Sequence, residues 1–161
     1  MAAKKKKAAK KTMKKAVKKT AKKKSAPKRV KRHQPEGLRI RTITPGFTVK
    51  DLQKSIDWYT GTLGFVIADR WMRDGNLVGV ELKAGVVSLY LGQDDFRKGR
   101  DRALGVGVRI YCGSAQNIDM LADGVKARGG TLDHEPQTQP WGERDFGITD
   151  PDGYKLTISS A

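Results

Sequence analysis

Apolar and polar residues alternate from residue 39 onward in a pattern that predicts short strands and helices. In residues 39–49, apolar and polar side chains alternate as they do in a strand. A helix opens at Asp51 and ends at Gly64, which suits the left-handed conformation that closes many helices. Three strands follow over residues 65–71, 77–83 and 86–91, with turn residues between them. The apolar face of the helix consists of Leu52, Ile56, Tyr59 and Leu63.

The second half of the chain repeats this order of elements. Residues 105–111 alternate as a strand, and Ser114 is expected to cap a helix that runs to Arg128. Three strands are predicted after it, over residues 131–134, 144–149 and 154–159. Two copies of a βαβββ unit, offset by about 65 residues, indicate an internal duplication. The fold class is therefore α+β, built from paired βαβββ modules.

Several motifs in this order resemble a known superfamily. They are DLQKSIDWY at residues 51–59, LGF at 63–65, WGERDF at 141–146 and DPDGY at 150–154. The region over residues 39–159 resembles the vicinal oxygen chelate proteins, which include glyoxalase I, extradiol dioxygenases, fosfomycin-modifying enzymes and bleomycin resistance proteins. The resemblance to bleomycin resistance proteins implies curved sheets that enclose a ligand cavity, in a homodimer.

Metal enzymes of this superfamily carry His, Gln or Glu ligands on the concave faces of four strands. The resemblance maps these positions to Thr44, Ser88, Gly107 and Thr157, with Gly105 and Tyr90 as the alternatives for the third and second. None of these residues has an imidazole or carboxylate, the groups that divalent transition metals prefer. We therefore expect no metal and no cofactor. The two histidines are His33 in the linker and His134, which we expect in an exposed polar turn.

Charged and aromatic residues on the concave faces are the candidate ligand-binding groups. Strand alternation directs Arg109 into the cavity, where its guanidinium would bind a ligand carboxylate or phosphate. The alternative is an internal pair between Arg109 and Glu81, or exposure of Arg109 at a dimer edge. A similar Trp-Gly segment borders the drug-binding groove in bleomycin resistance proteins, which makes Trp141 a candidate. The other candidate ligand-binding residues are Trp71, Tyr90, Tyr111, Ser88 and Thr157.

The net charge of +16 lies entirely in the first 36 residues, which hold 17 of the 33 Lys and Arg and a single acid. Such a segment repels itself and has little apolar surface to bury, so residues 1–38 are expected to be a disordered Lys-rich tail and linker. Residues 39–161 then form the vicinal oxygen chelate domain. The tail's composition resembles the tails of linker histones and histone-like bacterial proteins.

The tail predicts association with nucleic acid without sequence preference, because it carries phosphate-binding charge and no group that reads bases. A solubility tail, or one that binds any anionic surface, is the alternative interpretation. The expected contacts are Lys4, Lys5, Lys6, Lys7, Lys10, Lys11, Lys14, Lys15, Lys18, Lys19, Lys22, Lys23, Lys24, Lys28, Arg29, Lys31 and Arg32.

Other features of the sequence exclude broad classes of protein. No apolar run approaches the roughly 20 residues of a membrane span, and no apolar segment follows the charged N-terminus as in a secretory signal. Cys112 is the single cysteine, so an intrachain disulfide is excluded. We expect a cytoplasmic protein, with association to the nucleoid through the tail.

Three interpretations of function stay open, and we favour the first. The protein is a metal-independent binder of an aromatic or anionic small molecule, or a metal-independent lyase- or isomerase-like enzyme in which Glu81 or Tyr90 is the acid or base. The third interpretation is a nucleoid-associated protein whose domain dimerises a DNA-binding tail.

Overall fold

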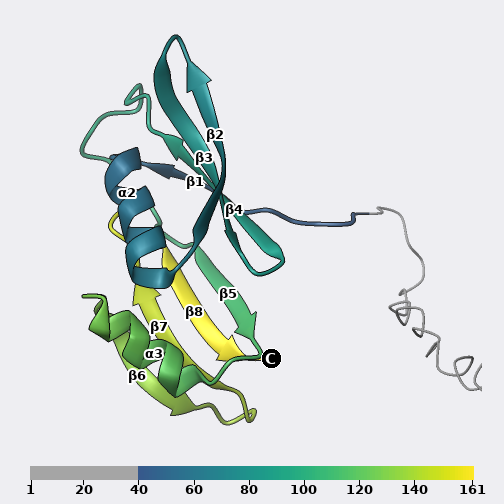
Figure 1. The fold of residues 1–161 in the computed structure, drawn as a ribbon. Helices are drawn as coiled ribbons and strands as arrows, with labels where there is room; N and C mark the ends of the chain where they lie inside the picture. The colour runs from purple at the N-terminus through teal and green to yellow at the C-terminus, as the bar shows by residue number, and fades with distance from the viewer. Residues whose placement is uncertain (1–39) are drawn as a thin grey trace, which may run out of the picture. The chain divides into compact units, whose positions relative to one another are not determined.

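Two βαβββ modules follow one another along the chain, as predicted (Figure 1). The computed structural model describes residues 40–161, of which Arg41–Ala161 make up one compact unit. The tail and linker predicted for residues 1–38 lie outside the described residues. The first module consists of β1 (Gly46–Val49), α2 (Leu52–Trp58), η1 (Tyr59–Leu63), β2 (Val66–Arg73), β3 (Asn76–Ala84) and β4 (Val87–Gln93). The second consists of β5 (Arg109–Ser114), α3 (Ile118–Ala127), β6 (Leu132–Thr138), β7 (Arg144–Thr149) and β8 (Lys155–Ser160).

Each module forms one four-stranded mixed sheet, and the two sheets do not close into a barrel. Sheet A has the strand order β1-β4-β3-β2, and sheet B has the equivalent order β5-β8-β7-β6. In each sheet the first strand pairs in parallel with the last, while the remaining pairs are antiparallel. The β2–β3 hairpin extends away from the second module at the top of Figure 1.

Both helices begin with a side-chain cap, and the first ends as a π-helix. The carboxylate of Asp51 accepts a hydrogen bond from the Lys54 backbone N–H at 3.0 Å, which confirms Asp51 as the start of the first helix. The final turn, η1, is π-helical and stops at Gly64, where φ is 82°. Asn117 caps α3 by accepting from the Met120 N–H. The predicted cap, Ser114, is wrong: it ends β5, and its hydroxyl accepts from the Gln116 N–H instead.

A single hydrophobic core joins the two modules. Phe47 of β1 stacks on Tyr154, next to β8, with ring centroids 4.0 Å apart and planes only 5° from parallel. The Tyr154 hydroxyl donates to the Thr48 carbonyl at 3.0 Å, and the Arg128 guanidinium beyond α3 donates to the Thr62 carbonyl at the end of η1. The modules are therefore held together through their helix-facing sides.

Three predicted strands differ from the observed strands by more than two residues at one or both ends. No strand covers residues 40–45, because β1 pairs with β4 only from Gly46 onward. The predicted strand over residues 105–111 begins later, at Arg109. Gly105 and Gly107 adopt positive φ angles of 68° and 73° in the preceding turn, which breaks strand geometry. The predicted strand over residues 131–134 is longer, since β6 continues to Thr138.

Candidate functional site

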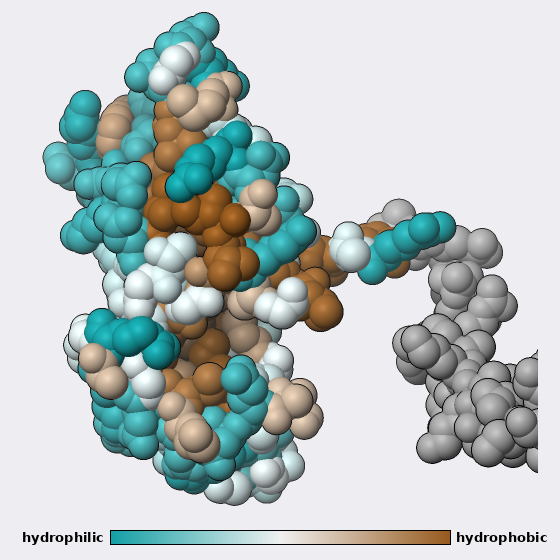
Figure 2. All heavy atoms as spheres, in the orientation of Figure 1, coloured by the Kyte–Doolittle hydropathy of each residue, from teal (hydrophilic) through white to brown (hydrophobic). Residues whose placement is uncertain are grey.

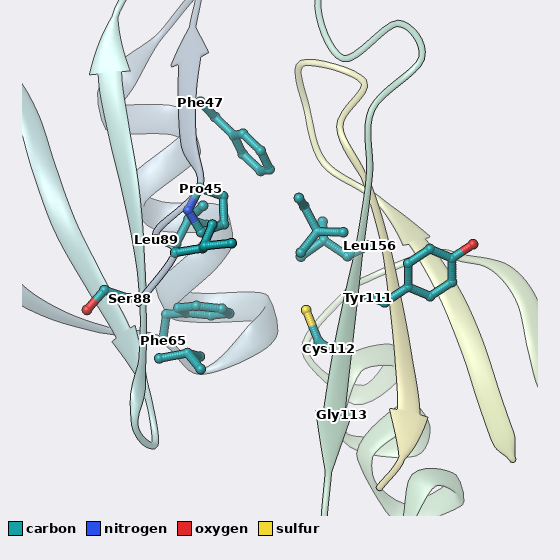
Figure 3. Close-up of a pocket in the computed structure, with 12 residues that line it drawn as sticks. Pro45, Phe47, Phe65, Ser88, Leu89, Tyr111, Cys112, Gly113 and Leu156 are labelled. Atoms are coloured by element: carbon teal, nitrogen blue, oxygen red, sulfur yellow. The ribbon is translucent and has the colours of Figure 1, made fainter. Parts of the chain in front are cut away.

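An apolar cleft of about 350 Å³ lies between the two modules. Figure 3 shows its walls: Phe47, Phe65 and Leu89 point into it from the first module, and Cys112 and Leu156 from the second. Figure 2 shows hydrophobic residues reaching the surface between the modules. Burial raises the pKa of the Cys112 thiol, so this cysteine behaves as part of the apolar wall.

The side chains of Ser88 and Tyr111 point away from this cleft in opposite directions (Figure 3). Ser88 lies on the concave face of sheet A, and Tyr111 on that of sheet B. The concave faces of one chain therefore look away from each other, and one chain does not enclose a cavity between them. For the same reason the predicted alternative of an Arg109–Glu81 pair is absent among the described residues. Glu81 instead accepts from the Ser88 hydroxyl at 2.7 Å and lies 3.7 Å from the Lys83 ammonium.

The concave face of sheet A carries an aromatic pair. Trp71 of β2 lies opposite Gly79 of β3, and a Cβ at Gly79 would stand 2.6 Å from the Trp71 ring. The missing side chain thus lets the indole lie on the sheet. Tyr90 of β4 meets Trp71 edge-on, with ring centroids 5.1 Å apart. Both rings are more than one third exposed, at 36% and 37%, so they present aromatic surface to a ligand.

Polar groups occupy the concave face of sheet B. The Arg109 guanidinium donates to the Thr157 hydroxyl oxygen at 2.9 Å, and Thr157 is only 4% exposed. His134 of β6 lies opposite Gly147 of β7, which in turn pairs with Thr157 of β8. A Cβ at Gly147 would stand 2.9 Å from the His134 imidazole, so the ring lies over this glycine.

The prediction that His134 occupies an exposed turn is therefore wrong. The imidazole is half-buried in the middle of β6, because this strand is longer than its apolar pattern indicates. Two irregularities in the pairing of β6 with β7 change the alternation of faces, which the sequence pattern does not reveal. The sequence signal that could have indicated this contact was Gly147, which lies inside the predicted strand over residues 144–149. A glycine within a strand often marks the close approach of another group.

The two modules place an aromatic ring over a glycine at equivalent positions. In sheet A, Trp71 pairs with Gly79, which pairs with Gly92. In sheet B the corresponding row consists of His134, Gly147 and Thr157. The duplicated fold has thus kept this geometry in both modules, with an indole in one and an imidazole in the other.

The residues predicted for the superfamily's metal positions do not fit a divalent metal. Ser88 and Thr157 offer hydroxyls, and Thr44 lies before β1 rather than within it. Gly107 also lies outside a strand, because β5 begins at Arg109. The β5 residue in register with Thr157 is Tyr111. No group of three or more His, Cys, Asp or Glu side chains in residues 40–161 has the arrangement of a metal site. This donor set is unsuited to zinc, nickel or iron.

The remaining candidates are spread over the domain. Trp141 is 69% exposed in the turn between β6 and β7, where its indole N–H lies 3.4 Å from a Glu143 carboxylate oxygen. Tyr111 is 74% exposed on β5, on the same face as Arg109. Of the two candidate acid/base residues, Tyr90 belongs to the aromatic pair, and Glu81 is held by Ser88. The structure therefore gathers the candidates into two separate faces, with Trp141 apart from both.

A salt bridge organises the loop that leads from β4 toward β5. Asp94 is 4% exposed and accepts from the Phe96 backbone N–H at 2.9 Å and from the Arg102 guanidinium at 2.6 Å. The backbone hydrogen bond, followed by the bonds and charge of Arg102, lowers the pKa of the Asp94 carboxyl. The salt bridge thereby holds the middle of this loop against its start.

The fold and the order of its motifs agree with the comparison to protein families. The family described as the Glyoxalase/Bleomycin resistance protein/Dioxygenase superfamily matches residues 39–158. The chain belongs to this superfamily. No curated protein matches the chain in a sequence comparison.

Solved structures share the fold of the superfamily domain. A superfamily member from Sphaerobacter thermophilus DSM 20745 is 25% identical, with a TM-score of 0.62, and the match covers 76% of this chain and 98% of that one. The hypothetical protein SA1046 from S. aureus is 26% identical over 76% of this chain and 98% of its own, with a TM-score of 0.56. TioX from Micromonospora sp. ML1, at 16% identity and a TM-score of 0.60, shares the fold over 75% of this chain and 96% of its own.

Among the described helices, none has both the length and the apolar character of a membrane span.

Proposed function

We propose that this superfamily member is a metal-independent small-molecule-binding protein whose ligand lies between the concave face of sheet A in one protomer and that of sheet B in a partner protomer. The observation that carries the proposal is the Trp71–Tyr90 pair, whose exposed rings lie on a sheet that lacks a side chain at Gly79. Aromatic surface of this kind binds planar or apolar molecules. Binding is favoured over catalysis because Glu81, the candidate acid or base, already accepts a hydrogen bond from Ser88.

The proposal includes a homodimer. Because the concave faces of one chain point apart, a cavity requires sheet A of one protomer to face sheet B of its partner. The apolar cleft between the modules supports this arrangement, since Val86, Val87 and Ile43 at its border are 102%, 58% and 85% exposed. Exposed apolar surface of this kind commonly marks a protein interface.

The proposal also assigns the basic tail to nucleic acid. The 17 Lys and Arg among the first 36 residues favour sequence-independent binding to phosphates. The domain then carries a ligand-binding function on a protein that associates with a polyanion, in the cytoplasm.

The experiment is an unbiased search for molecules that co-purify with the full-length protein. Small molecules are released by denaturation and identified by mass spectrometry, for the wild type and for the double variant W71A/Y90A. Met120→Ala is the matched control, because Met120 is 73% exposed on α3, away from the concave faces. We expect the same ligand from the wild type and M120A, and its loss from W71A/Y90A. Equal recovery from all three proteins, or no ligand from any, would refute the proposal.

A further inference from the structure

The guanidinium of Arg109 has an unusual environment for an arginine on a folded domain. None of the ion pairs among residues 40–161 includes it. Its one hydrogen bond there goes to the neutral hydroxyl of Thr157 at 2.9 Å. A guanidinium carries five N–H donors in a planar fork, so most of these donors stay free for another acceptor. The Thr157 contact directs the fork over β8.

The sheet surface beside Arg109 offers further polar groups. Thr157 is 4% exposed and accepts from Arg109, which leaves its own hydroxyl hydrogen available to donate. Gly147, the next position across the sheet, has no side chain, and the His134 imidazole lies over it. Lys155 pairs with Arg109 in register and alternates onto the same face as Thr157. The donors of Arg109, Thr157 and Lys155 thus lie on one face of sheet B, beside the His134 imidazole.

The acids on this face are already engaged. Asp133 accepts from the Thr149 hydroxyl at 2.8 Å, and Asp145, which is 6% exposed, accepts from the Gln139 amide at 2.8 Å. Neither carboxylate lies within ion-pair distance of Arg109. A negatively charged group that approaches this face would therefore meet the positive charge of Arg109 without displacing an existing pair.

We propose that Arg109 and Thr157, with the His134 imidazole beside them, form an oxyanion subsite that binds the carboxylate or phosphate end of the ligand. The guanidinium fork bonds two oxygens of the anion, and the Thr157 hydroxyl donates to one of them. This inference rests on the proposed function, because the apolar part of the ligand would extend from the subsite toward the aromatic pair of the partner protomer. The ligand class is thus an aromatic or apolar molecule with one oxyanionic end.

The test compares three naphthalene probes that differ in one substituent: 1-naphthoate, 1-naphthyl phosphate and the neutral 1-naphthamide. Each is titrated into the full-length protein in about 0.15 M salt, which screens exposed charges of the tail. The readout is the shift of the Gly147 and Thr157 amide resonances, which report on β7 and β8 locally. The anion that binds more tightly shows whether the subsite prefers a carboxylate or a phosphate.

We expect at least one anion to bind about tenfold or more tightly than 1-naphthamide, as charge-assisted bidentate bonds imply. Arg109→Gln should remove this preference, Arg109→Lys should keep part of it, and Thr157→Val should weaken it. Arg70→Gln is the control, because it removes the same charge from an exposed position of β2 in sheet A. The amide spectrum of each variant establishes that it is folded.

Two outcomes would overturn the subsite. In the first, 1-naphthamide binds as tightly as both anions, or R109Q binds them as the wild type does. In the second, none of the probes shifts the Gly147 and Thr157 resonances. Recovery of a co-purified ligand that W71A/Y90A loses would leave the proposed function standing in either case, so the two failures are distinguishable.

Discussion

The Tyr59 hydroxyl donates a 2.9 Å hydrogen bond to the carboxylate of Asp150, and both groups are buried. Tyr59 begins the π-helical turn of the first module, and Asp150 begins the turn between β7 and β8 of the second. Burial raises the pKa of the Asp150 carboxyl, while hydrogen bonds from the Tyr154 N–H and the Tyr59 hydroxyl act in the opposite direction. Burial also raises the pKa of the Tyr59 phenol. The DPDG turn thus fastens one module to the other.

The neighbouring Asp152 strengthens this contact. One of its carboxylate oxygens accepts from the Lys50 backbone N–H at 3.0 Å, and the other accepts from the Ser55 hydroxyl at 3.1 Å. The turn therefore contacts the start of α2 and the start of η1 at once. Residues that resemble a superfamily motif in the sequence have a structural role in joining the modules.

Tyr59→Phe should lower the free energy of unfolding by about 1–3 kcal/mol, because it leaves the buried Asp150 carboxylate short of one donor. Tyr111→Phe is the matched control, since its ring is 74% exposed and its hydroxyl makes no hydrogen bond to the described residues. Urea unfolding followed by circular dichroism measures both. Equal stability of Y59F and the wild type would show that the hydrogen bond contributes little.

Gly79→Ala should destabilise the domain and disturb Trp71. The added Cβ would stand 2.6 Å from the Trp71 ring and 2.9 Å from the Leu91 carbonyl oxygen, so the indole must move. Overpacking of this kind costs about 1–3 kcal/mol. Near-ultraviolet circular dichroism follows the indole environment, and urea unfolding follows stability. Gly61→Ala is the control, because nothing lies within 4 Å of a Cβ at that position. An unchanged spectrum in G79A would contradict the described position of Trp71.

The salt bridge of Asp94 with Arg102 should make stability depend on pH in the acidic range. The pKa of Asp94 is lower in the folded than in the unfolded protein. Its contribution to the stability of the folded protein is therefore fully present above about pH 4, the ordinary carboxyl range. That contribution is lost as the pH falls through the folded-state pKa. Asp94→Asn should therefore be less stable than the wild type near neutral pH, and the difference should shrink in acid. Thermal melting across this range measures it.

Asp95→Asn serves as the comparison for this experiment, because its carboxylate is 63% exposed and pairs with the exposed Arg97. A surface pair of this kind contributes little. A constant difference between D94N and the wild type from neutral to acid pH would rule out the titration of Asp94 as its cause.

Residues 39–161 alone should fold and dimerise with a stability close to that of the full chain. This fragment has equal numbers of basic and acidic residues, and it contains the complete duplicated unit. Light scattering gives the mass of the fragment, and urea unfolding gives its stability. A fragment that is unfolded or aggregated would place part of the fold in the first 38 residues. A monomeric fragment would contradict the proposed dimer.

The tail should bind duplex DNA without sequence preference. Each phosphate that is neutralised contributes about −0.9 to the slope of log affinity against log salt, so we expect a slope of about −5 or steeper. Deleting residues 1–32 should abolish binding at near-physiological salt, because the remaining domain is nearly neutral. Fluorescence anisotropy with two unrelated duplexes measures affinity and preference. Equal binding by the deleted protein would place the DNA site on the domain.

The sequence by itself determined the order of the elements, because their signals are local. Asp51 caps the first helix through a residue three positions away, and the apolar residues of β3, β4 and α3 recur at the spacing of strand and helix. The same alternation of side chains along each strand placed Ser88, Tyr90, Arg109 and Thr157 on concave faces. The mismatch between metal ligands and the residues at the mapped metal positions follows from residue identity once the resemblance to the superfamily supplies those positions.

Only the tertiary structure decided which groups meet. Pairing across strands brought His134 over Gly147 and Trp71 over Gly79, and irregular register in β6 changed the face that His134 occupies. The direction of the concave faces depends on how the modules pack, and this packing depends on contacts such as Tyr59 with Asp150, which are 91 residues apart. Contacts over such separations leave no periodic signal in the chain, because they depend on how whole elements fit together rather than on neighbours in sequence.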